Sequence, residues 1–190
     1  MLHRRFFTTR SLHRHLSYTR FTSFPKMYGK PLPAVLPGPI LSDREAVADA
    51  CFRAFASIDQ CDLELLKSSI TDDITTDIAS KPCDGAEELI TKVWTHVAHN
   101  LDTVHYLNNM RVAIDTETTA RVSFMAMAVH CKLGDGYDLA PGSKFTTGAV
   151  YECEAVKGEQ EGFWRLKAMK SNHVWGSGDE GIMRPAGAPE

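Results

Sequence analysis

Long apolar runs are missing from this sequence: none approaches the roughly 18 consecutive residues that a membrane-spanning helix needs. No internal repeat is visible either. Hydrophobic residues make up 43% and charged residues 24% of the 190 residues, a balance typical of globular proteins. The sequence therefore predicts one domain with a sizeable core and flanking tails, and no membrane partner.

Acidic residues are missing from the N-terminal part of the sequence. Residues 1–41 carry seven Lys or Arg and no Asp or Glu. The remaining residues hold 14 basic and 24 acidic side chains, so their formal net charge is −10. They contain no basic stripe interleaved with aromatic residues. An acidic body of this kind argues against a nucleic-acid partner, because contacts to phosphates need clustered Lys and Arg.

Paired cysteines are missing as well. The five cysteines form no CxxC motif and stand at no zinc-ligand spacing from a histidine. An odd, scattered set is typical of a reducing compartment, where cysteine behaves as a small buried hydrophobe. We therefore expect no metal site. The five are Cys51, Cys61, Cys83, Cys131 and Cys153.

The N-terminal residues have the composition of a targeting segment. Residues 1–26 combine arginines with scattered leucines and phenylalanines, as mitochondrial presequences do, and residues 14–17 (RHLS) resemble a matrix-protease cleavage site. The alternative is a leader upstream of a true start at Met27, so we expect a cytoplasmic or mitochondrial protein. Residues 29–39 hold four prolines and two glycines, which predicts an extended linker. We expect residues 1–41 to be disordered.

The folded domain is predicted to cover residues 42–176. Ser42 followed by Glu45 forms a capping box, the signature of a helix N-terminus. Five apolar residues then recur at helical spacing, so we expect a helix that ends near Asp59. They are Val47, Cys51, Ala54, Phe55 and Ile58.

Further along, the apolar pattern changes from helical to strand spacing. Asp62 can cap a short helix over LELLKSS, and residues 70–78 (ITDDITTDI) place three isoleucines on one face of a strand. Residues 82–85 are expected to be a loop and residues 86–99 the third helix. Four strands are predicted to follow, over residues 104–114, 120–133, 145–157 and 163–175. Residues 177–190 are predicted to be a disordered tail.

The predicted order is α-α-β-α-β-β-β-β, which indicates an α+β domain. Three early helices and a long late meander favour a strongly curved sheet that wraps the helices. Such curvature leaves a cavity between the sheet and the first helices. A cavity of that kind is the default place for a small ligand.

His130 stands at the end of a predicted strand face that leaves room for a ligand. Successive strand residues alternate between faces, so Ala126 and Ala128 share a face with His130. A well-packed core would fill that space with larger side chains. The alternative is a core histidine that is satisfied by a backbone carbonyl.

His105 and Asp59 are the other two candidates. His105 opens the strand after the third helix, where an imidazole can point inward or stay half-exposed. Asp59 closes the first helix at the negative end of its dipole, an unfavourable place that asks for a partner such as a histidine. Alternatively, Asp59 begins the connection or caps the second helix in place of Asp62. The other histidines are more typical of surface or edge positions; they are His96, His99 and His173.

Four stretches carry a resemblance to a known family: FASIDQCDLELLKSSI, DTVHYLNNMRV, AVHCKL and GFWRLKAMKSNHVWGSGD. Together they resemble the fungal scytalone dehydratase-like branch of the SnoaL-like, nuclear transport factor 2-like superfamily, over about residues 42–179. In that branch an aspartate follows the first helix, and two histidines lie on successive strands after the third helix. Asp59, His105 and His130 match those places in order and separation. The resemblance implies a cystatin-like α+β barrel: a cone of antiparallel or mixed sheet around three N-terminal helices.

The resemblance has departures at the pocket. Two tyrosines of the dehydratase fall at Ile58 and Ile78, which cannot donate a hydrogen bond, so scytalone itself is not the expected substrate. The dehydratase's serine and asparagine on a later strand align with Tyr151, Glu152 or Cys153, and the choice stays open. We expect eight residues to line the pocket: Ile58, Ile78, Asn109, Phe124, Ala126, Ala128, Tyr151 and Cys153.

The expected activity is a lyase, isomerase or cyclase that acts without a cofactor on a small apolar carbonyl or polyketide-like molecule. Because histidine titrates near neutral pH, His105 and His130 can serve as acid and base, and Asp59 can orient a histidine, with His130 as the first choice. The alternatives are a non-catalytic domain that binds a hydrophobic ligand or serves in an assembly, and a protein-binding adaptor with a filled cavity. The resemblance also implies a homodimer or homotrimer formed through the open sheet face.

Overall fold

Helix α1 (Asp43–Gln60) opens the domain in a computed structural model that describes residues 32–36, 41–158 and 162–184. Ser42 and Glu45 form the expected capping box, with the Ser42 side chain accepting the Glu45 backbone N–H. The helix ends where Cys61 turns to a left-handed conformation, at φ 53°. The capping box and the helix end near Asp59 are therefore confirmed.

Helix α2 (Leu63–Ser69) and strand β1 (Ile70–Ile78) also follow the sequence pattern. The Asp62 side chain caps α2 by accepting the Leu65 backbone N–H at 3.0 Å. In β1, Ile70 and Ile74 are buried while the residues between them are more exposed. The third helix is continuous over the predicted range, but its middle turn is π-helical; its parts are α3 (Ala86–Leu89), η1 (Ile90–Trp94) and α4 (Thr95–Asn100).

The expected loop at residues 82–85 is wrong, because most of it is strand β2 (Lys81–Asp84). β2 pairs antiparallel with β1 through a tight turn in which Ala79 and Ser80 have φ values of 52° and 59°. Pro82 is tolerated because β2 is an edge strand, where a missing N–H donor breaks no ladder inside the sheet. The observed order is therefore α-α-β-β-α-β-β-β-β.

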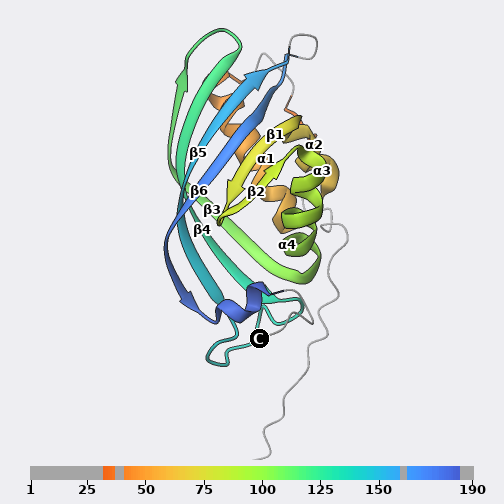
Figure 1. The fold of residues 1–190 in the computed structure, drawn as a ribbon, viewed down its shortest axis with the longest axis vertical. Coiled ribbons are helices and arrows are strands. Elements are labelled where there is room, and N and C mark those ends of the chain that lie inside the picture. The colour runs from red at the N-terminus through yellow and green to blue at the C-terminus, as the bar shows by residue number, and fades with distance from the viewer. Residues whose placement is uncertain (1–31, 37–40, 159–161, 185–190) are drawn as a thin grey trace, which may run out of the picture.

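Four long strands complete one six-stranded sheet with the order β2-β1-β6-β5-β4-β3. Only the β1–β6 pair is parallel, so the sheet is mixed. Figure 1 shows the sheet curving around the helices, which all lie on its inner side. The predicted α+β class and the curved sheet around three helices are confirmed. The four strands are β3 (Leu101–Ile114), β4 (Thr119–Lys132), β5 (Phe145–Lys157) and β6 (Trp164–Gly178).

The ordered chain continues past the predicted domain end at residue 176. β6 runs to Gly178, and a short 3-10 helix, η2 (Glu180–Met183), follows with Ile182 buried. Residues 177–184 are thus not a disordered tail, because one apolar side chain anchors them to the domain. The predictions for residues 1–31, 37–40 and 185–190, including the leader, lie outside the described residues.

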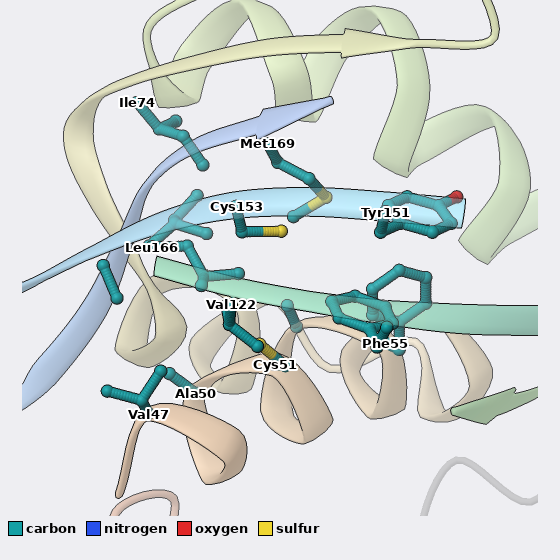
Figure 2. Packing of buried hydrophobic residues seen from close by; sticks show 14 of the residues in the cluster. Val47, Ala50, Cys51, Phe55, Ile74, Val122, Tyr151, Cys153, Leu166 and Met169 are labelled. Atoms are coloured by element: carbon teal, nitrogen blue, oxygen red, sulfur yellow. The ribbon is translucent and has the colours of Figure 1, made fainter. Parts of the chain in front are cut away.

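The core lies between α1 and the inner face of the sheet. Figure 2 shows Val47, Cys51 and Phe55 of α1 pointing at side chains from the strands, among them Leu166 and Tyr151. The inner face of β4 alternates with exposed residues as predicted, from Ala120 to His130. Within the described part of the chain, no helix is both long and apolar enough to cross a membrane.

Candidate active site

A cavity of about 930 Å³ lies between the helices and the inner face of the sheet. Its apolar wall comes mainly from α1, the third helix and β1, including Phe55, Ile58 and Val93. The opposite wall comes from the strands, above all from residues 169–178 of β6, and carries polar side chains. The polar side chains from the strands include His105, His130, Thr147, Tyr151, Ser171, Asn172 and His173.

Asp59, in the last turn of α1, is bonded to strand β3. Its Oδ2 accepts the His105 backbone N–H at 2.9 Å. Its Oδ1 lies 2.7 Å from both the Thr103 hydroxyl and His105 Nδ1. Three donors therefore satisfy the carboxylate that the sequence placed at the unfavourable end of a helix.

The contact with Asp59 determines which nitrogen of His105 carries the proton. A carboxylate only accepts, so Nδ1 donates to Asp59, and in the neutral ring Nε2 keeps its lone pair. The side chains of His105 and Asp59 are 8% and 20% exposed, so the pair is shielded but in reach of the cavity. The Phe55 ring packs edge-on against His105 at 5.3 Å between ring centres and limits its rotation.

His130, on β4, is also fixed as one tautomer. Its Nδ1 lies 3.2 Å from the Phe145 carbonyl oxygen, which can only accept, so Nδ1 carries the proton and Nε2 is free. The residue is 5% exposed. Burial, reinforced by nearby His105, lowers the pKa of His130 from 6.5 to about 4. His130 is therefore uncharged at neutral pH.

The two imidazoles share one end of the cavity. Their ring centres are 5.8 Å apart and their planes stand at 87°. Asp59, however, bonds to His105 and not to His130, the partner we had expected first. The reason is topological: the end of α1 packs against the edge strand β3, whereas His130 lies one strand further into the sheet.

Four of the eight expected pocket residues line the cavity, namely Ile58, Ile78, Ala128 and Tyr151. The expectation for the other four is wrong. Asn109 is exposed at an irregularity in β3, where its φ is 51° and its amide contacts Met125 Sδ at 3.2 Å. The remaining three are packed in the core, away from the cavity wall; they are Phe124, Ala126 and Cys153.

Two of the histidines assigned to the surface reach the cavity. His96 and His173 both line it, and His96 Nε2 lies 2.9 Å from the Met183 carbonyl oxygen of η2. His99 is exposed, as expected. Thr103 was missed, although the Thr103-x-His105 spacing puts both side chains on one strand face and could have indicated a shared partner.

The described residues contain no group of three His, Cys, Asp or Glu side chains arranged to hold a metal ion. All five cysteines are free thiols. What converges on the cavity is instead one carboxylate–imidazole pair and a second, neutral imidazole. Such an arrangement can accept a proton, stabilise the resulting imidazolium and return the proton.

Comparisons with known proteins agree with this fold. A family model described as "SnoaL-like domain" matches residues 39–170. The chain is 37% identical over 142 residues to the "Terrestric acid biosynthesis cluster protein E" of Penicillium crustosum, which covers 74% of this chain and 89% of that protein.

Two solved structures show the same architecture at low identity. A protein from Novosphingobium aromaticivorans, provisionally named a scytalone dehydratase, superposes with a TM-score of 0.59 at 18% identity, over 77% of this chain and 94% of that one. A nuclear transport factor 2-like superfamily protein from Salmonella enterica gives 0.59 at 12% identity, over 70% and 91%. These likenesses show that the fold is nuclear transport factor 2-like.

Proposed function

This chain belongs to the SnoaL-like domain family, and on that premise we propose that it is a lyase, isomerase or cyclase acting on a small, largely apolar carbonyl or polyketide-like molecule. The observation that carries the proposal is the 2.7 Å contact between Asp59 and His105 beside His130, at one end of a cavity whose helical wall is largely apolar. The Penicillium relative, named for a biosynthesis cluster, supports a place in secondary metabolism.

His105 is the base in this proposal. Its free Nε2 removes a proton from a carbon next to the substrate carbonyl, and the electron pair of the broken C–H bond moves into the enolate. Of the two imidazoles, Asp59 contacts only that of His105, so it acts by fixing the tautomer and stabilising the imidazolium. Positioned proton transfer of this kind contributes about 10²- to 10⁴-fold to a rate.

His130 has a different role, because its Nδ1 proton is committed to Phe145 and its Nε2 is a lone pair. It accepts a hydrogen bond from a hydroxyl group that the substrate itself carries. The proton on His105 is then the one that returns, either to another carbon in an isomerisation or to a departing hydroxyl in an elimination. The proton that His105 removes is thus the proton that it gives back, so the step needs no cofactor.

The cavity favours an enzyme over the two alternatives. An adaptor would fill this space with side chains, whereas about 930 Å³ is open, within the range of small-molecule sites. A passive apolar pocket would not need an ionisable pair shielded at one end. Apolar walls also strengthen the interaction between Asp59 and a charged His105 by excluding water.

Self-association through the outer sheet face is part of the proposal. Tyr106, Met127, Gly148 and Trp175 form one row across β3, β4, β5 and β6. The Trp175 ring lies over Gly148, where any Cβ would clash with the indole nitrogen. Tyr106, Met127 and Trp175 are 53%, 37% and 46% exposed, which makes an apolar surface suited to a second copy of the chain.

The position of the protein in the cell depends on the N-terminal residues. A presequence over residues 1–26 would direct the chain to mitochondria, whereas a start at Met27 would leave it in the cytoplasm. Fusing residues 1–41 to a fluorescent protein in a fungal cell decides between the two by import or its absence.

The test of the chemistry uses 2-tetralone, a bicyclic ketone with acidic protons beside its carbonyl. In D₂O, proton NMR measures how fast these protons exchange with and without the protein. We expect the wild-type protein to accelerate the exchange and His105→Ala to lower the catalysed rate by about 10²- to 10⁴-fold. His99→Ala is the matched control, since His99 is exposed and outside the cavity wall. Equal catalysis by the wild type and His105→Ala would refute the proposal.

A further inference from the structure

Tyr151 brings a phenol to the cavity at a place that the proton-transfer groups do not use. It lies on the inner face of β5, is 7% exposed and lines the cavity. Its ring is stacked on Phe124, with 5.2 Å between ring centres and 2° between planes, and packs edge-on against Phe55 at 5.1 Å. Figure 2 shows Tyr151 beside Phe55 at one end of the packed cluster. Two rings therefore hold the phenol in one orientation.

The phenol has a polar neighbour on the adjacent strand. Ser171 of β6 stands directly opposite Tyr151 in the strand register and forms a hydrogen bond with it. The Ser171 oxygen accepts the Ala79 backbone N–H at 3.1 Å, so the serine hydroxyl keeps a proton to donate to the phenol oxygen. When Ser171 donates that proton, the phenol O–H is left for a ligand.

The phenol also stays protonated. Burial, only partly offset by the hydrogen bond with Ser171, raises the pKa of Tyr151 to about 12. Tyr151 is therefore a neutral hydrogen-bond donor throughout the neutral pH range.

This donor is set apart from the proton-transfer end along the sheet. Tyr151 pairs with Phe124, whereas Thr147, four residues earlier on β5, pairs with Ala128, the register neighbour of His105. The Phe55 ring packs against both side chains, with its centre 5.3 Å from that of His105 and 5.1 Å from that of Tyr151, so the two rings are no more than about 10 Å apart. Phe55 itself lines the cavity. A flat ligand that lies beside Phe55 can therefore touch both ends.

Two apolar side chains of the cavity wall cannot replace the phenol. Ile58 and Ile78 line the cavity where the resemblance leads one to expect tyrosines, and neither has a polar atom in its side chain. A substrate oxygen that faces these isoleucines gains no partner from them, and an unpaired oxygen is costly in an apolar site.

We propose that Tyr151, supported by Ser171, is a specificity-determining residue that donates a hydrogen bond to a second substrate oxygen, held at the opposite end of a flat apolar body from the carbon that His105 deprotonates. This inference rests on the proposed function. It narrows the substrate class to aromatic or polycyclic ketones that carry a remote ether, carbonyl or hydroxyl oxygen.

The test compares two probes of matched size, 6-methoxy-2-tetralone and 6-ethyl-2-tetralone, by titration calorimetry. Both carry the same ketone, and only the first has an acceptor oxygen at the far end. We expect the wild-type protein to bind the methoxy probe about 3- to 10-fold more tightly, which corresponds to one neutral hydrogen bond. Tyr151→Phe should bind both probes equally, and Ser171→Ala should reduce the preference.

Matched variants separate this inference from the proposed chemistry. Tyr137→Phe removes an exposed phenol outside the cavity and should keep the preference. His105→Ala should lose proton exchange yet keep the preference, so a failure of the chemistry is distinguishable from a failure of the subsite. A preference that survives in Tyr151→Phe, or its absence from the wild type, overturns the inference.

Discussion

Asp59 binds His105 at two places: Oδ2 accepts the backbone N–H at 2.9 Å and Oδ1 accepts the ring Nδ1–H at 2.7 Å. One carboxylate at the end of α1 thus fixes both the backbone and the ring of a residue 46 positions later. The ring cannot rotate without breaking a charged hydrogen bond, which keeps Nε2 directed at the cavity.

Asp59→Asn should reduce catalysis with little effect on ligand binding. The amide can turn its NH₂ group toward Nδ1, which favours the wrong tautomer and removes the charge that stabilises the imidazolium. We expect the exchange rate of bound 2-tetralone to fall by about 10²-fold, with the Kd for 2-tetralone unchanged within about threefold. Saturation kinetics followed by NMR measure both values. A large loss of affinity at an unchanged saturated rate would contradict the role given to Asp59.

Thr103→Val should produce a smaller effect of the same kind. Valine keeps the shape of threonine but removes the hydroxyl that donates to Asp59 Oδ1 at 2.7 Å. Losing one such bond costs about 0.5–1.5 kcal/mol, so we expect the exchange rate to fall about two- to tenfold. Thr118→Val, in the exposed β3–β4 turn, is the matched control. Equal rates for the two variants would show that Thr103 does not position Asp59.

His130 should make the folded state less stable in acid. Its folded pKa of about 4 lies below the unfolded value of 6.5, so the unfolded chain binds more protons between these pH values. Its contribution is fully present above pH 6.5 and is lost as the pH falls toward 4, by up to about 3 kcal/mol. Urea unfolding as a function of pH should show a shallower acid loss in His130→Gln than in the wild type. If the free energy of unfolding fell with pH equally in the two proteins, the lowered pKa of His130 would be contradicted.

Met127→Lys should dissociate the proposed oligomer without unfolding the domain. Met127 is 37% exposed on the outer sheet face, so a lysine there disturbs no core contact, but it places a charge in an apolar interface. We expect light scattering to give a multiple of 21.1 kDa for the wild type and a monomer for the variant. Thr118→Lys, in the exposed β3–β4 turn, is the control. A wild-type monomer at micromolar concentration would refute self-association through this face.

The sequence predicted most of the fold because its periodicities are long and regular. The capping box at Ser42 and the alternation along β4 needed only local rules. β2 was missed because it has four residues and contains Pro82, which argues against a strand unless an edge position is known in advance.

The site was predictable only in part, because the sequence does not show which strand meets the end of α1 or how far along the strands the cavity begins. The sequence placed His105 and His130 on inward faces, but the choice of partner for Asp59 depends on which strand meets the end of α1. Asn109 was misplaced because the irregularity after Asn108 breaks the alternation of faces. Phe124 was assigned to the correct face, yet the core around it is filled and the cavity begins further along the strand.

The central claim is that His105 and His130 both present an unprotonated Nε2 to the cavity, of which only His105 is backed by a carboxylate. Nitrogen NMR of histidine-labelled protein, assigned with His105→Ala and His130→Gln, measures the protonation of each ring nitrogen directly. We predict Nδ1–H and a bare Nε2 in both rings at pH 8, and a change in the His105 ring alone in Asp59→Asn. An Nε2–H signal from His105 in the wild-type protein would contradict the account, because that nitrogen could not then take a proton from carbon.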